Sequence, residues 1–120
     1  MQVKVEGLGP KFVMKMTLHN SGQYPLYNST LVFSFQDDIY MLGDRQDNEN
    51  VHALNYNSSY HVNVPLLLPS IKCVYENEIT NIDAQGRAGQ VMVILKAKDS
   101  SAPLLSATVL MPAAEPLFDV

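Results

Sequence analysis

The chain has 120 residues, of which 47% are hydrophobic, and its 8 Lys and Arg against 12 Asp and Glu give a net charge of −4. This length and composition suit one packed domain, and the basic residues form no run, which argues against nucleic acid or an anionic membrane surface as the main partner. No apolar run approaches the ~20 residues of a transmembrane helix, so we expect no direct membrane insertion.

Apolar and polar residues alternate with a period of two in the first part of the chain, which predicts strands. Residues 2–6 alternate over a short stretch, and residues 7–10, Gly-Leu-Gly-Pro, then break the run. The clearest alternation covers 11–20 and predicts a strand with one buried and one wet face. The residues expected on its buried face are Phe12, Met14, Met16 and Leu18.

The next stretch predicts a hairpin followed by a loop. Alternation runs from 27 to 36, and the residues expected in the core are Tyr27, Ser29, Leu31, Phe33 and Phe35. A tight turn at Asp37 and Asp38 is followed by a short return strand over 39–42, so the two runs are typical of a β-hairpin. Residues 43–57 are polar and predict a loop.

Five further runs follow this loop, and most of them predict strands. Alternation resumes at 60–64, and the proline-bounded run 65–69 suits an edge strand or a crossing between sheets. Residues 71–75 alternate and fade into a polar stretch. Residues 91–95 are apolar on both faces, which predicts a central strand covered on both sides. The last strand is expected over 105–111.

These elements predict an all-β fold with about eight short strands. Short strands with regularly spaced turns favour a two-sheet, immunoglobulin-like β-sandwich, and a closed barrel is the main alternative. We expect the sandwich to cover 1–112 and a C-terminal tail to cover 113–120. One cysteine, Cys73, and no Trp exclude the disulfide and core Trp of antibody domains.

Chemistry-bearing residues are few and poorly spaced for a reaction. Cys73 lies on an apolar strand face, which is typical of a buried structural thiol. The three histidines lack metal-ligand spacing: His19, His52 and His61. Three acidic residues lack the spacing of an EF-hand loop: Asp44, Asp47 and Glu49. We therefore expect no enzyme activity, no metal and no cofactor.

Two features indicate binding to other proteins. Apolar residues remain on strand faces that are nominally exposed: Val13, Val32, Val74, Met92, Ile94 and Leu110. The tail joins acidic residues to Leu117 and Phe118 after a proline, a composition that suits docking into a groove. The candidate interaction residues are therefore Val13, Lys15, Val32, Ile94, Leu117 and Phe118.

Three segments together resemble a known family. They are QVKVEGLGPKF at 2–12, VPLLLP at 64–69 and SAPLLSATVLMP at 101–112, in that order across nearly the whole chain. They are similar to the C-terminal, γ-adaptin-ear-like (GAE) domains of the Bardet-Biedl syndrome 1 protein family, which are parts of BBSome subunits. The matching segments are packing and turn segments without catalytic content.

The resemblance implies a γ-adaptin-ear-like sandwich preceded by a β-propeller, and the contact with a small GTPase is expected in that propeller and not here. It implies a scaffold role in a coat-like complex that moves ciliary membrane proteins, with other BBSome subunits as partners. The alternative is an ear-type domain that binds short peptide motifs in cargo or accessory proteins. The implied locations are the cytoplasm, the cilium, the ciliary membrane as a peripheral protein, the basal body and centriolar satellites.

Overall fold

The computed structural model describes residues 1–42, 57–97, 100 and 102–114. Eight strands and no helix make up the regular structure of these residues, which confirms the all-β prediction. None of the described residues forms a helix that could cross a membrane. The strands are β1 (Gln2–Glu6), β2 (Lys11–His19), β3 (Leu26–Gln36), β4 (Tyr40–Leu42), β5 (Asn57–Leu67), β6 (Lys72–Asn81), β7 (Gln90–Ala97) and β8 (Pro103–Leu110).

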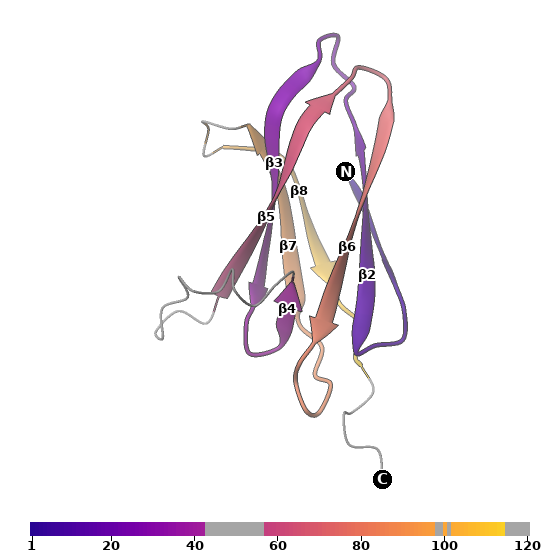
Figure 1. The fold of residues 1–120 in the computed structure, drawn as a ribbon, viewed down its shortest axis with the longest axis vertical. Helices are drawn as coiled ribbons and strands as arrows, with labels where there is room; N and C mark the ends of the chain where they lie inside the picture. The colour runs from indigo at the N-terminus through magenta and orange to yellow at the C-terminus, as the bar shows by residue number, and fades with distance from the viewer. Residues whose placement is uncertain (43–56, 98–99, 101, 115–120) are drawn as a thin grey trace.

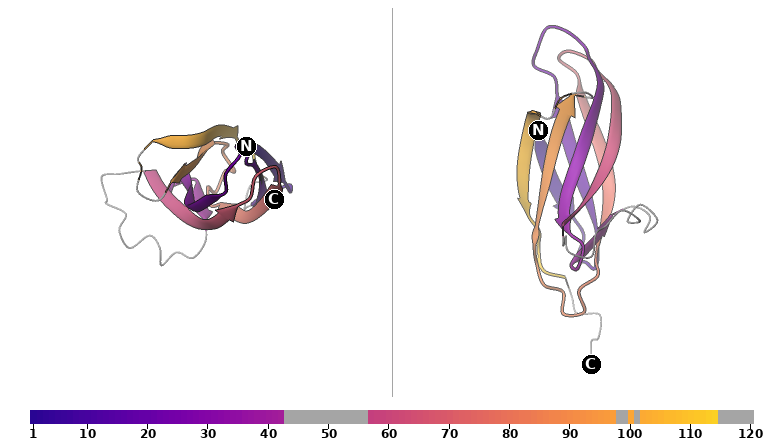
Figure 2. Two further views of the ribbon diagram at one scale, coloured as in Figure 1. Left: turned by 90° about the horizontal axis from the view of Figure 1, so that it is seen from above. Right: turned by 90° about the vertical axis from the view of Figure 1, so that its left-hand side faces the viewer.

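The strands form two antiparallel sheets that pack face to face (Figures 1 and 2). The first, called the β2 sheet here, has the order β1-β2-β6-β4, and the second, the β3 sheet, has the order β5-β3-β7-β8. Separate sheets with their own edge strands make a sandwich and not a closed barrel. The expected immunoglobulin-like sandwich is thus confirmed.

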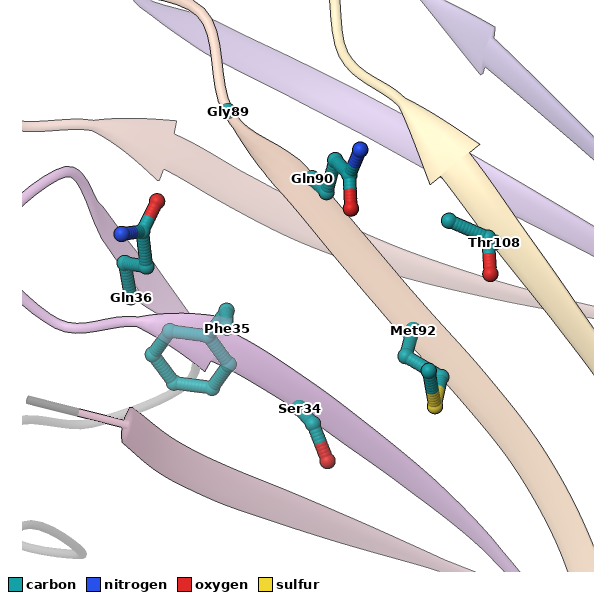
Figure 3. Close-up of a pocket in the computed structure, with 7 residues that line it drawn as sticks. All are labelled: Ser34, Phe35, Gln36, Gly89, Gln90, Met92 and Thr108. Atoms are coloured by element: carbon teal, nitrogen blue, oxygen red, sulfur yellow. The ribbon is translucent and has the colours of Figure 1, made fainter.

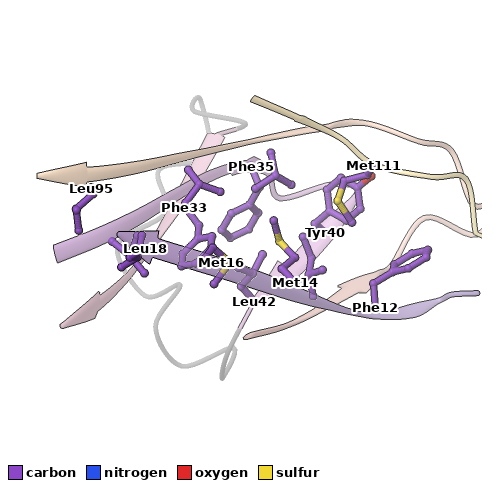
Figure 4. Packing of buried hydrophobic residues seen from close by; sticks show 14 of the residues in the cluster. Phe12, Met14, Met16, Leu18, Phe33, Phe35, Tyr40, Leu42, Leu95 and Met111 are labelled. Atoms are coloured by element: carbon purple, nitrogen blue, oxygen red, sulfur yellow. The ribbon is translucent and has the colours of Figure 1, made fainter. Parts of the chain in front are cut away.

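The core lies between the two sheets and comes from the alternation of their strands. All four residues expected on the buried face of β2 are completely buried (Figure 4). The β3 sheet faces them with Leu31, Phe33, Phe35, Val91, Val93 and Leu95. Because side chains on a strand point alternately to its two faces, the residues between these positions lie on the outer surface.

The expected hairpin between β3 and β4 is wrong. β4 pairs with β6 in the opposite sheet, with Tyr40 opposite Asn81 and Leu42 opposite Ile79. The turn after β3 is tight, since the N–H of Ile39 donates to the carbonyl of Gln36 at 3.1 Å, but it carries the chain across the sandwich. Alternation gives the same signal for a hairpin and for a crossing, because it reports only which face is buried.

The expected burial of Tyr27 is also wrong, since its side chain is 63% exposed. Asn28 has a φ of 55°, in the left-handed region, and this breaks the alternation so that Leu26 packs against the core instead. Asn28 has no partner in the register with β5, which passes from Tyr27 opposite Leu66 to Ser29 opposite Val64. The proline-bounded run was expected in an edge strand or in a crossing between sheets, and β5 is an edge strand, where the missing N–H of Pro65 costs no ladder bond.

Two further expectations about strand length and cover are corrected. β6 does not fade after residue 75 but continues to Asn81, and its Ile79 is completely buried opposite Phe12. β7 is central in its sheet, yet it is covered on one face only, because Met92 is 44% exposed.

The packed chain continues to Ala114, which is 8% exposed and whose N–H donates to the carbonyl of Gly86 at 3.1 Å. The expected loop lies outside the described residues except for Asn57, which begins β5. The tail from 115 to 120 also lies outside them. The expected division of the chain at residue 112 stays a prediction.

Candidate functional site

The candidate interaction residues divide between opposite faces of the sandwich. Val13 and Lys15 lie on β2 and face outward from the β2 sheet, where both are partly exposed. Val32 and Ile94 lie on the outer face of the β3 sheet, on neighbouring strands. The remaining two candidates, Leu117 and Phe118, lie outside the described residues. The single surface that the sequence allowed is therefore two separate surfaces.

The outer face of the β2 sheet is a ladder of ion pairs. Nζ of Lys15 lies 3.2 Å from Oε2 of Glu6 and 3.6 Å from Oε1 of Glu76, on the strands at either side. The hydrogen bond to Glu6, followed by the charges of both carboxylates, raises the pKa of Lys15. A second cross-strand pair joins Lys11 to Glu78 at 3.5 Å. The charge of Lys15 is thus already neutralised within this face.

Val13 is isolated within this ladder. It stands in register between Glu6 on β1 and Glu78 on β6. Val74, which is 58% exposed, stands opposite Thr17, two rows away on the far side of Lys15. The two valines therefore do not form a continuous apolar surface.

The outer face of the β3 sheet has the opposite character. Val32 stands directly opposite Ile94, with His61 and Ser106 completing the same row across the four strands. In such a row neighbouring Cβ atoms lie about 5 Å apart, so Val32 and Ile94 can touch. Met92, the next outward residue on β7, lies in the neighbouring row of the same face, opposite Ser34. We call Val32, Met92 and Ile94 the outer-face patch.

An uncharged hollow of about 440 Å³ adjoins the outer-face patch (Figure 3). The side chains around it come from β3, β7 and β8 and include two amides, two hydroxyls and a thioether (Figure 3). Such groups can hydrogen bond to a peptide backbone or an uncharged polar side chain, whereas an ion would find no opposite charge. The lining residues are Ser34, Phe35, Gln36, Gly89, Gln90, Met92 and Thr108.

The sequence analysis did not identify Gln36, Gln90 or Thr108 as candidates. All three are exposed, and for Gln36 and Thr108 the alternation of the predicted strands indicated this, whereas Gln90 directly precedes the strand predicted over 91–95. Their proximity depends on the order β3-β7-β8, which joins strands distant in sequence. The missing information was the strand order and not the residue type.

A second hollow, of about 210 Å³, lies at one end of the sandwich. Asn20 shapes its rim, since its Nδ2 donates to the carbonyls of Tyr24 at 2.8 Å and Leu67 at 3.1 Å. A hollow of this size and lining could take one apolar side chain. The lining residues are His19, Asn20, Ser21, Leu26, Leu67, Leu95, Leu104 and Leu105.

The groups considered for catalysis or metal binding are dispersed. His19 and His61 are exposed on different sheets, and Cys73 is a free, partly buried thiol on β6. In the part of the chain that the structure describes, no three His, Cys, Asp or Glu residues are placed to hold a metal ion. The other candidates lie outside that part: Asp44, Asp47, Glu49 and His52.

The comparison with known families agrees with the eight-stranded sandwich. The model of the family described as "Bardet-Biedl syndrome 1 protein, GAE domain" matches residues 1–117. The chain belongs to this family. The resemblance carried by the three sequence segments is thus confirmed, and the GAE family accounts for nearly all of the chain.

Two curated relatives of this GAE-family chain carry the name BBSome complex member BBS1. The mouse protein (Mus musculus) is 28% identical over 114 residues, and the human protein (Homo sapiens) is 29% identical over 114 residues. Each match covers 94% of this chain and 17% of the relative. The chain thus spans about a sixth of the length of these relatives.

Proposed function

We propose that this GAE-family chain is a non-enzymatic interaction and scaffold domain of a BBSome subunit. In this role it supports assembly of a coat-like complex that moves ciliary membrane proteins, and its partners are other BBSome subunits. Family membership and the names of the two relatives support the proposal. The implied locations are those of such a complex: the cytoplasm, the cilium, the ciliary membrane as a peripheral protein, the basal body and centriolar satellites.

The observation that carries the proposal is the contrast between the two outer faces. Covering the β2 sheet would remove water from the ion pairs of Lys15 and Lys11, and desolvation of charges opposes binding. The outer-face patch and its hollow contain no charged group. The central part of a protein interface is depleted in charge and enriched in apolar side chains, including Met. The β3 sheet is therefore the face we assign to a partner subunit.

Capture of partner subunits by the immobilised chain tests this assignment. Val32→Lys and Ile94→Lys each put a charge at the centre of the patch, and we expect captured BBSome subunits to fall about tenfold, which corresponds to about 1.4 kcal/mol. Val74→Lys is the matched control, because it makes the same change at a valine that is 58% exposed on the opposite sheet. Circular dichroism of all three variants checks that each of them folds.

Two results would contradict the proposal at different levels. If Val74→Lys lowers capture while Val32→Lys and Ile94→Lys do not, the partner contacts the β2 sheet and the choice of face is wrong. If the unsubstituted chain captures no BBSome subunit, the scaffold function itself is wrong.

A second candidate function is recognition of short linear peptides, as in an adaptor ear. The hollow at the end of the sandwich favours it, because leucines from β3, β5, β7 and β8 line a space that fits one apolar side chain. Calorimetric titration with acidic peptides containing one Phe or Leu tests it, with Leu104→Asp as the blocking variant. A flat isotherm at about 1 mM peptide would remove this candidate.

A further inference from the structure

Among the described residues, the edge of the β3 sheet at β8 has neither a charge nor a proline after its first residue. Natural proteins protect edge strands with charges, prolines or short length. β1 has five residues and carries Lys4 and Glu6, β4 has three residues, and β5 contains Pro65. β8 begins at Pro103 and then runs through seven residues, Leu104 to Leu110, with neither a proline nor a charge.

The register identifies which backbone groups of β8 point to the open edge. The N–H of Met111 donates to the carbonyl of Gly89 at 3.0 Å, and these residues are opposite because Leu110 pairs with Gln90. Antiparallel ladders alternate between hydrogen-bonded and non-hydrogen-bonded pairs. Ala107 therefore bonds to β7, whereas Ser106 and Thr108 direct their N–H and C=O groups away from it.

The core is incompletely covered at the same edge. β1 approaches β8 there, but the two strands are not hydrogen bonded to each other (Figure 2). The inward side chains of both strands are only partly buried, including Val3 and Val5 on β1 and Leu105 and Val109 on β8. Inward residues of the neighbouring β2 and β7 are completely buried. An aliphatic seam thus runs beside backbone groups that have no hydrogen-bond partner within the described residues.

We propose that β8 receives an extended segment of a partner protein, which adds to the sheet as a further antiparallel or parallel strand. The free groups of Ser106 and Thr108 would pair with the backbone of that segment, as in other cases of strand addition. Aliphatic residues at alternate positions of the segment would cover the seam. The paired stretch would be uncharged, because β8 offers no charge to compensate a buried one.

This inference goes beyond the proposed scaffold function, since it concerns a backbone edge and not the outer-face patch. The two can be separated by experiment. Val32→Lys and Ile94→Lys alter the outer face and leave the free groups of β8 in place. Strand addition should therefore persist in both variants even when capture through the outer face is lost.

The probe is an eight-residue peptide that alternates Val and Thr. N-methyl groups on alternate nitrogens leave one edge able to pair and prevent the peptide from stacking on itself. Amide hydrogen exchange of the chain is followed by NMR. With free peptide at about ten times its Kd, exchange at Ser106 and Thr108 should slow about tenfold, while Ala107, already bonded to β7, should not change.

Two controls keep the outcome decisive. Thr108→Pro removes one edge N–H and should abolish the protection at Ser106, whereas Thr108→Ala keeps the N–H and should preserve it. The same peptide with every amide methylated should not bind to the parent chain. This control does not depend on whether the proline variant folds. Unchanged exchange at the edge amides, or equal binding of the fully methylated peptide, would overturn the proposal. Protection that rises with chain concentration in the absence of peptide would instead assign the edge to β8 of a second copy.

Discussion

The hydroxyl of Tyr40 accepts a hydrogen bond of 2.8 Å from the backbone N–H of Gly89. Tyr40 begins β4 in the β2 sheet, and Gly89 directly precedes β7 in the β3 sheet, so this bond joins the two layers of the sandwich. The tyrosine is 1% exposed, and its burial raises the pKa of the hydroxyl. The hydroxyl therefore stays uncharged at neutral pH, and its oxygen is the acceptor of this bond.

Tyr40→Phe should destabilise the chain by about 1–3 kcal/mol, because the ring stays while the N–H of Gly89 loses its acceptor inside the protein. Urea unfolding followed by circular dichroism measures this change. Tyr24→Phe is the matched control at a side chain that is 80% exposed, and it should stay within about 0.5 kcal/mol of the parent. Equal effects of the two substitutions would show that the Tyr40 bond contributes nothing.

Gly86→Ala should lower the free energy of unfolding by about 2 kcal/mol or more. Gly86 has a φ of +70°, and a Cβ built on it would collide with the carbonyl oxygen of Ala114. Gly22→Ala is the control, because Gly22 has no such φ and its new Cβ would meet only the side chain of Asn20, at 3.2 Å. Thermal unfolding should rank the two variants in that order. A milder effect at Gly86 than at Gly22 would contradict the packing of Ala114 against this loop.

The sequence was sufficient to locate most strands and their buried faces, because both depend on local alternation. Phe12 to Leu18 shows this clearly, since burial follows every second residue. The left-handed conformation of Asn28, which turns Tyr27 outward, is a property of the backbone at one residue and leaves no periodic signal. The failure at Tyr27 therefore has a local conformational cause.

The candidate surface was less predictable, because it depends on which strands are neighbours. Val13 and Val32 have equivalent signals, each an apolar residue at an outward position. Only the pairing of the strands shows that Val32 stands opposite Ile94, about sixty residues later in the chain, whereas Val13 stands opposite Glu78. Strand order is a long-range property, and periodicity in one segment does not contain it.

Ser29→Ala should be neutral or should stabilise the chain by about 1 kcal/mol. Ser29 is 1% exposed, and its Oγ has no hydrogen-bond partner among the described residues. Its hydroxyl therefore loses its hydration on folding without a replacement. Urea unfolding at neutral pH measures the difference.

Ser58→Ala makes the same chemical change at a serine whose hydroxyl is satisfied. Ser58 is 6% exposed, and its Oγ donates to Oδ2 of Asp37 at 3.2 Å. The free energy of unfolding of this variant should be lower than that of the parent by about 1 kcal/mol. A loss at Ser29 as large as that at Ser58 would mean that the hydroxyl of Ser29 is not an unpaired polar group.

Arg87→Gln should destabilise the chain more at neutral pH than in acid. Nη2 of Arg87 lies 2.9 Å from Oδ1 of Asp83, and the backbone N–H of Arg87 donates to Oδ2 at 2.8 Å. These bonds, the side-chain one first, lower the pKa of Asp83 below its ordinary value of 3.8. A carboxyl with a lowered folded-state pKa stabilises the fold above its unfolded-state pKa, and this contribution is lost as the pH falls through the folded-state value.

The melting temperatures of the parent and of Arg87→Gln should therefore differ most above the ordinary pKa of 3.8 and converge as the pH falls through the lowered folded-state pKa of Asp83. Lys72→Gln removes an equal charge from a residue that forms no ion pair within the described part of the chain, so its effect should lack this dependence on Asp83. A difference for Arg87→Gln that stays constant, or widens, as the pH falls would show that the bond to the charged carboxylate does not stabilise this loop.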